Sequence, residues 1–163
     1  MGKITVEQAR ALLREWGGIE RRVAELRSEL DWARREIDSK ADSVTIAGYG
    51  AASGGGRKKK DLADRVIRLE KSRAAFERLA ERIDSEMAAL IERKNRIDAA
   101  IAQLPERHAD VVRMWYRQGL SHARIAYALH YSEDRVKHIK SESDALVALL
   151  IDKNGGIAED DTQ

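Results

Sequence analysis

The chain has 163 residues and a net charge of +2, with 36% charged residues, 5% aromatic residues, one proline and no cysteine. This composition favours long exposed helices over one large globular core, and the lack of cysteine excludes disulfides and thiolate metal sites. No apolar run approaches the roughly 20 residues that cross a bilayer, and the N-terminus has no apolar signal core, so we expect a soluble cytoplasmic protein without membrane contacts.

The first segment carries apolar residues at alternating spacings of three and four, which predicts a helix with the apolar seam of a coiled coil. Thr5 followed by Gln8 resembles a capping box and would start this helix near Val6. Gly17 and Gly18 weaken the helix, so a kink or local fraying is expected there. The seam comprises Ala9, Leu12, Trp16, Ile19, Val23, Leu26, Leu30, Ala33 and Ile37.

Residues 39–60 break this periodicity and hold five glycines between Gly48 and Gly56. We predict a flexible glycine-rich loop over this range. Glycines precede lysines here, but no Gly-Lys-Ser/Thr triplet follows, so a phosphate-binding loop is not expected. The basic run is interpreted as a solvated loop end, with contacts to an anionic partner as the alternative; it comprises Arg57, Lys58, Lys59 and Lys60.

The seam resumes after Asp61 and predicts a second long helix that ends at Leu104. The glycine-rich loop permits an antiparallel hairpin over residues 1–104, and whether the seam closes within one chain or between chains stays open. Because an isolated two-helix hairpin buries little surface, we expect a homo-oligomer, with a dimer favoured. The seam positions, two of them charged, are Leu62, Val66, Leu69, Arg73, Phe76, Ala80, Ile83, Met87, Leu90, Lys94, Ile97, Ile101 and Leu104.

Pro105 marks the end of the second helix, because a residue before proline is disfavoured in helical geometry. Three shorter helical stretches follow, at residues 106–117, 121–129 and 132–151. They predict a C-terminal domain over residues 105–151, and residues 152–163 are expected to form a flexible acidic tail. The fold class is therefore all-α: a long helical hairpin or coiled coil followed by a small three-helix domain.

The last two short helices match a helix-turn-helix unit. Ser121 and Ser132 are good N-caps, and the apolar faces hold Ile125, Ala126 and Leu129 on one helix and Val136, Ile139 and Leu146 on the next. The opposite face of the last helix carries the candidate base contacts Asp134, Lys137, His138 and Ser141. Candidate phosphate contacts are Ser121, Arg124, Ser132, Arg135 and Lys140. The alternative is a three-helix interaction domain whose polar face is simply solvated.

Residues 104–150 as a unit resemble region 4 of sigma-70-type factors. The matching features are Leu104-Pro105, an apolar helix with Val111, Val112 and Met114, the Gly119-Leu120-Ser121 start of the next helix, Ile125-Ala126, and a Ser132-capped helix through Lys137. His130 departs from a common glycine in the turn, and Ser143-Asp144 departs from a common Ala-Leu. The arrangement of the whole chain also resembles phage late-transcription regulators of the ArpU and RinA type. The resemblance implies a DNA-binding regulator of phage or prophage genes in a bacterial cell, with RNA polymerase as a further partner.

Other patterns do not indicate chemistry. The four histidines, His108, His122, His130 and His138, are not joined by a cluster of carboxylates, so no metal site and no cofactor are expected. No catalytic arrangement of side chains emerges, and we expect a protein that is not an enzyme. Trp115, Tyr116, Tyr127 and Tyr131 are interpreted as core and rim of the C-terminal domain. Two further functions stay open: a phage terminase small subunit, and an adaptor that binds proteins through its coiled coil without binding DNA.

Overall fold

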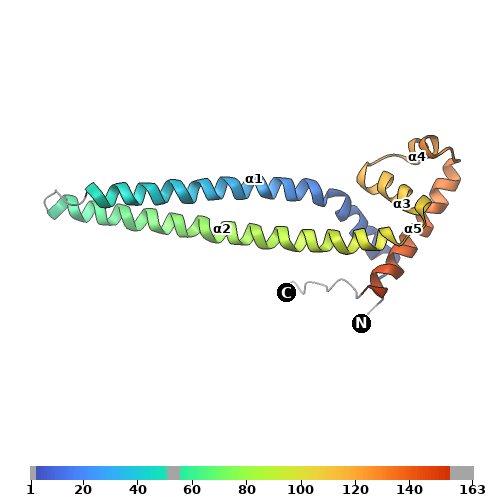
Figure 1. Cartoon of the computed structure of the whole chain (residues 1–163), viewed down its shortest axis with the longest axis horizontal. Helices are drawn as coiled ribbons and strands as arrows, with labels where there is room; N and C mark the ends of the chain where they lie inside the picture. Colours follow the sequence, from blue (N-terminus) through green and yellow to red (C-terminus); the bar gives the residue numbers. More distant parts are fainter. Residues whose placement is uncertain (1–2, 51–55, 155–163) are drawn as a thin grey trace. The chain divides into compact units, whose positions relative to one another are not determined.

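The computed structural model describes residues 3–50 and 56–154. These residues form helices and connecting turns without a strand, so the all-α prediction is confirmed (Figure 1). The elements are α1 (Val6–Gly50), α2 (Gly56–Ala102), α3 (Glu106–Val112), the π-helical turn η2 (Arg113–Arg117), α4 (His122–Leu129) and α5 (Glu133–Lys153). Two long helices thus precede three shorter helices and a π turn, in the order that the sequence pattern predicts.

The predicted capping box begins α1 as expected. The Thr5 amide donates to Gln8 Oε1 over 2.8 Å, and the Gln8 amide donates to Thr5 Oγ1 over 3.2 Å. The α1 seam is buried at all predicted positions except Leu12 and Ile37, which are half-buried, and Leu13 takes the buried place beside Leu12. The α1 helix continues through Gly17 and Gly18, so of the kink or local fraying expected there, the local fraying is not found.

The glycine-rich loop is much shorter than the predicted range of 39–60. The α1 helix continues to Gly50 and α2 begins at Gly56, while residues 51–55 lie outside the described part of the chain. Polar residues are accommodated in the last turns of α1 because their hydroxyls bond within the helix: Ser43 donates to the Ser39 carbonyl and Thr45 to the Ala41 carbonyl. Loop composition therefore misplaced both helix ends. The predicted basic run, residues 57–60, falls in the first turns of α2.

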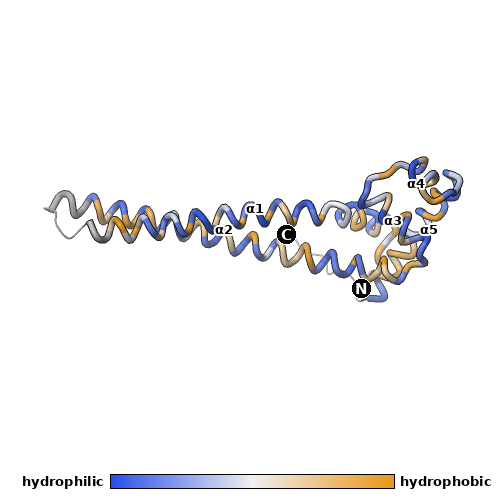
Figure 2. The backbone as a smooth tube through the Cα atoms, turned by 45° about the horizontal axis from the view of Figure 1, so that its top comes forward, coloured by the Kyte–Doolittle hydropathy of each residue, from blue (hydrophilic) through white to orange (hydrophobic). Residues whose placement is uncertain are grey.

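The chain divides into two compact units, and the first comprises residues 23–88. Within it, α1 and α2 lie side by side, and hydrophobic residues recur along both helices among hydrophilic ones (Figure 2). Trp32 of α1 meets Phe76 of α2 edge to face, with ring centroids 5.3 Å apart. Arg34 pairs with Asp84 over 3.6 Å. The two long helices thus contact each other within this unit, and Arg73 is exposed and pairs with Glu77 along its own helix.

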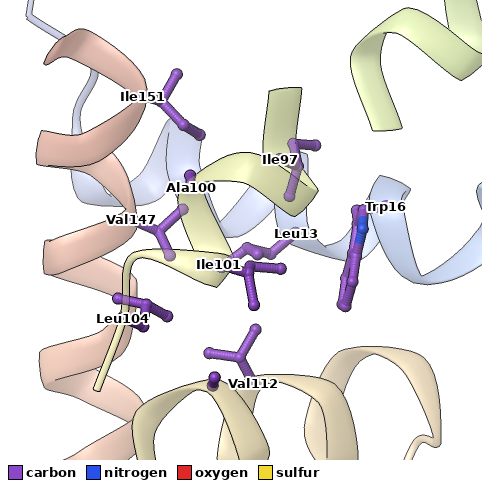
Figure 3. Close-up of a cluster of buried hydrophobic side chains, with 10 residues drawn as sticks. Leu13, Trp16, Ile97, Ala100, Ile101, Leu104, Val112, Val147 and Ile151 are labelled. Atoms are coloured by element: carbon purple, nitrogen blue, oxygen red, sulfur yellow. The ribbon is translucent and has the colours of Figure 1, made fainter. Parts of the chain in front are cut away.

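The second unit comprises the described residues 3–22 and 89–154. Its core joins the start of α1 and the end of α2 to α3 and α5 (Figure 3). The fully or nearly buried members of this core are Leu13, Trp16, Ile97, Ala100, Ile101, Leu104, Ala109, Val112, Val147 and Ile151. Residues on both sides of the predicted boundary at residue 105 thus contribute to one hydrophobic core. The physical reason is that the short helices bury too little apolar surface alone and share the ends of the long helices.

The predicted tail also begins later than residue 152. The α5 helix extends to Lys153, and both carboxylate oxygens of Asp152 accept the Ile4 amide, at 2.9 and 3.0 Å. Asp152 therefore anchors the N-terminal segment to the end of α5. Residues 155–163 lie outside the described part of the chain.

Candidate nucleic-acid interface

Serine hydroxyls cap both helices of the helix-turn-helix, as the sequence predicts. The Ser121 hydroxyl accepts the Arg124 amide at the start of α4, and the Ser132 hydroxyl accepts the Arg135 amide over 3.2 Å at the start of α5. These caps leave other amides of each first turn pointing outward, together with the positive end of the helix dipole. Both helix starts are therefore suited to an anionic partner such as a phosphate.

The turn between α4 and α5 passes through a left-handed residue. His130 has φ 55° and ψ 43°, and the Tyr131 amide donates to the Ala126 carbonyl over 2.9 Å. Glycine is preferred at such a helix end because it has no Cβ to clash. His130 adopts this left-handed conformation in place of glycine, so the turn is formed, at the cost of some backbone strain at this residue.

A small core holds α4 and α5 at a fixed angle. It consists of Val111, Ile125, Ala126, Val136 and Ile139, all buried, with Leu129 and Tyr131 packed at its edge. The predicted inward residues are thus confirmed, except that Leu146 is half-buried and packs against the larger core of this unit. Small Ala126 lies in the interface between the two helices, as its size predicts.

The structure brings the four predicted base-contacting residues onto the solvent side of α5. Asp134, Lys137, His138 and Ser141 are all exposed. Lys137 pairs with Asp134 over 3.2 Å, and His138 Nε2 lies 3.2 Å from a carboxylate oxygen of Glu142. This face begins in the first turn of α5, where recognition helices present side chains to base edges.

Four of the five predicted phosphate contacts are exposed beside this face: Ser121, Arg124, Ser132 and Arg135. Lys140 is not. Only 15% of its side chain is exposed, and its ammonium donates to Asp144 over 3.0 Å and to the Tyr116 hydroxyl over 3.2 Å. The ammonium also lies over the rings of Trp115 and Tyr116, 5.3 and 5.2 Å from their centroids. Lys140 is therefore held in an internal polar network and is not exposed with the other four residues.

The centre of this network is Asp144, a fully buried carboxylate. It accepts Arg10 Nε over 2.8 Å and the Tyr116 hydroxyl over 2.9 Å, besides Lys140. Burial, with the hydrogen bond to Asp144, raises the pKa of Tyr116, and the same carboxylate raises the pKa of Arg10 by accepting its hydrogen bond. Neighbouring Ser143 donates to the Ile139 carbonyl over 2.7 Å. Asp144, one of the two residues that depart from the common Ala-Leu, thus links α1, η2 and α5 through its hydrogen bonds.

Of the four aromatic residues predicted to form the core and rim of the C-terminal domain, Tyr127 lies elsewhere. Tyr127 of α4 is 86% exposed, so it is a surface residue of the helix-turn-helix and not part of its core or rim. Trp115, Tyr116 and Tyr131 are partly buried, as predicted, and Trp115 stacks on His122 with centroids 4.2 Å apart. A 100° helical wheel could have found Tyr127, because it falls opposite Ile125 and Leu129.

Within the described ranges, no group of three or more His, Cys, Asp or Glu residues is placed to hold a metal ion. No helix among these residues is long and apolar enough to cross a bilayer. The expected lack of enzyme activity remains a prediction.

Comparison with known families addresses the C-terminal helices. Residues 100–149 match the family model of sigma-70, region 4. Region 4 is a DNA-binding helix-turn-helix domain, so the match covers the capped helices and the exposed α5 face described above. The predicted region 4 resemblance is confirmed, whereas the resemblance to phage regulators of the ArpU and RinA type stays a prediction. Neither the curated proteins nor the solved structures include a match to this chain.

Region 4 accounts for less than a third of the chain. The matched range begins at Ala100, within the last turn of α2, and so it includes Ile101 and Leu104 of the shared core. Leu13 and Trp16 of α1 belong to the same core and lie outside the match. In this chain, residues outside the matched range thus contribute to the hydrophobic core that packs against the matched helices.

Proposed function

We propose that this protein is a sequence-specific DNA-binding transcriptional regulator of phage or prophage genes. The observation that supports it best is the exposed polar face at the start of α5, held on a capped helix-turn-helix within the region 4 match. The phage assignment rests on the resemblance of the whole arrangement, a helical N-terminal half before a region 4 unit. RNA polymerase is a further partner that this resemblance implies.

In the proposed complex, the first turns of α5 enter the major groove of double-stranded DNA. Lys137 donates to guanine O6 and N7, and Asp134 accepts from cytosine N4, which are pairings that base-edge geometry favours. Arg124 and Arg135 contact phosphates, and the capped starts of α4 and α5 add amide donors. Phosphate contacts set the register of the protein on DNA, while Lys137, Asp134 and their neighbours read its sequence.

Oligomerisation is the second part of the proposal. Residues 105–151 hold seven basic and six acidic residues, so one such unit neutralises few phosphates and binds DNA weakly by charge alone. Pairing two units on one DNA molecule compensates, because the second contact becomes intramolecular. Residues 23–88 supply exposed apolar side chains for a dimer contact, at Trp32, Ile46 and Ile67. The basic residues 57–60 remain candidates for contacting an anionic partner.

The test is selection from a random DNA pool with the full-length protein, followed by affinity measurements at one salt concentration. An enriched motif is expected, and a two-fold repeat within it indicates a dimer. Lys137→Ala should weaken binding by about 1–3 kcal/mol and relax preference at one base pair. Arg124→Ala is the matched control, because loss of a phosphate contact weakens binding equally on every sequence.

Each alternative has its own outcome in this test. Assembly into a ring of many subunits that binds a packaging site favours a terminase small subunit. Absence of binding to any DNA at low salt favours the protein-binding adaptor and refutes the proposal.

A further inference from the structure

The carboxylate of Glu142 contacts two histidines from two different helices. One oxygen lies 3.2 Å from His108 Nε2 of α3 in a hydrogen bond, and the other lies 3.2 Å from His138 Nε2 of α5. The three side chains differ in exposure: 18% for His108, 49% for Glu142 and 67% for His138. Glu142 is thus fixed on its sheltered side by His108 and meets the candidate base contact His138 on its open side.

His108 Nε2 is hydrogen-bonded to Glu142, and a carboxylate only accepts, so this nitrogen carries a proton. His138 Nε2 lies within ion-pair distance of the other carboxylate oxygen, and a proton on this nitrogen is the arrangement that avoids repulsion. An unprotonated Nε2 would instead turn its lone pair toward a negative charge. His108 fits this assignment independently, because its Nδ1 is buried without a hydrogen-bond partner in the described residues, and a second proton there would be an unpaired buried donor. In a neutral imidazole with its proton on Nε2, Nδ1 is a hydrogen-bond acceptor.

We propose that Glu142 is a positioning residue that fixes the proton of His138 on Nε2, so that His138 reads an amino group with Nδ1. Major-groove amino groups belong to adenine N6 and cytosine N4, whereas guanine and thymine present oxygen acceptors at the corresponding places. His138 therefore selects adenine or cytosine over guanine or thymine at the base it contacts. This inference rests on the proposed DNA-binding function and names the chemistry that one residue of its site recognises.

The other charged residues of α5 near Glu142 and His138 are paired elsewhere, so the contact between Glu142 and His138 can be changed separately. Lys137 is paired with Asp134 toward the helix start, and Arg10 and Lys140 are bound to Asp144 on the buried side of α5. Among the described residues, Glu142 is accordingly the charged side chain in contact with His138. Its removal changes the hydrogen-bonding character of His138 without breaking the internal network at Asp144.

The experiment compares the full-length protein with Glu142→Gln, and Glu133→Gln is the control. Glu133 is an exposed residue of the same helix, so its substitution removes the same charge without touching His138. Selection with His138→Ala first locates the base that His138 contacts. Affinity is then measured on DNA in which this base lacks its amino group, with purine replacing adenine or 2-pyrimidinone replacing cytosine.

The unaltered protein and Glu133→Gln should lose about fivefold or more in affinity on the altered DNA, as expected for one base-edge hydrogen bond. Glu142→Gln should lose less than about twofold, because its His138 also populates the tautomer with a proton on Nδ1. A selected guanine or thymine at this position, or an equal loss in all three proteins, would refute the inference while leaving DNA binding intact. Failure of every protein to bind DNA would overturn the proposed function and the inference together.

A measurement without DNA separates these outcomes further. Nitrogen-15 chemical shifts of the imidazoles at neutral pH distinguish a protonated Nε2 from a protonated Nδ1. We expect His138 to show the Nε2-protonated tautomer in the unaltered protein and in Glu133→Gln, and a mixture in Glu142→Gln. A mixture in all three would show that Glu142 does not position His138, whatever the protein binds.

Discussion

The pair of glycines in α1 offers a sharp test of how the helix-turn-helix unit is held. A Cβ placed on Gly17 would overlap the carbonyl oxygen of Tyr116 and lie 2.9 Å from its carbonyl carbon, whereas a Cβ on Gly18 meets nothing within 4 Å. Adjacent Trp16 is 2% exposed, and its indole N–H donates to Asp98 over 2.8 Å. The backbone of α1 therefore touches the backbone of η2 at Gly17, and only a residue without a side chain fits.

The magnitudes follow from this geometry. Alanine is favoured over glycine within a helix by about 1 kcal/mol, and Gly18→Ala should gain up to that amount because its side chain enters open space. Gly17→Ala makes the same gain but forces two backbones apart, and overpacking of this kind costs about 1–3 kcal/mol or more. Because neither backbone can rotate away as a side chain can, we take about 3 kcal/mol. Net destabilisation by Gly17→Ala is then about 2 kcal/mol.

Urea unfolding of both variants and of the unaltered protein, followed by far-ultraviolet circular dichroism, measures the difference. The free energy of unfolding should differ between Gly17→Ala and Gly18→Ala by about 3 kcal/mol, with the unaltered protein between them. Equal values for the two variants would mean that α1 does not contact η2 closely at Gly17. The same result would contradict the packing of residues 3–22 against residues 89–154.

Three further predictions concern residues that sequence patterns left uncertain. His130→Gly should raise the free energy of unfolding by about 0.5–1 kcal/mol, because glycine relieves the left-handed backbone; an unchanged urea midpoint would refute this. Asp144→Ala should lower the free energy of unfolding by about 2–4 kcal/mol, since two cations and a phenol lose their shared buried partner. A loss below about 1 kcal/mol would contradict the network. Folding holds the Tyr116 proton more tightly than its ordinary pKa of 10.0, so stability is full below pH 10 and falls as pH rises above it; Tyr116→Phe should reduce this alkaline fall, and an unchanged slope would contradict it.

Periodicity predicted most of the fold because burial follows from residue spacing. Ala9, Trp16, Ile19 and Leu26 are buried where the heptad pattern places them, and Ile83 and Ile97 are buried on α2. The same reasoning placed Asp134 and His138 on the exposed face of α5. These successes concern one helix at a time, where the orientation of a side chain depends only on its position in the turn.

Contacts between distant segments were not predictable in this way. The position of Lys140 on its own helix predicts a surface cation. Its side chain is largely buried because Tyr116 of η2 packs beside Asp144 and both accept its hydrogen bonds. Glycine at position 17 predicts a less stable helix, whereas in the structure the missing side chain permits the close approach of η2. In both cases the decisive partner lies about a hundred residues away or on another element, which no local pattern reports.

The shared core also changes what the long helices contribute to DNA binding. A segment cut at Pro105 would leave the apolar faces of Val112, Val147 and Ile151 without Leu13, Trp16 and Ile97. Deleting several buried side chains of this size costs about 2–5 kcal/mol each, which is comparable to the whole stability of a small domain. The ends of α1 and α2 therefore belong to the folding of the region 4 unit itself. Any contribution of residues 23–88 to oligomerisation is physically distinct from this role, because those residues form a compact unit of their own.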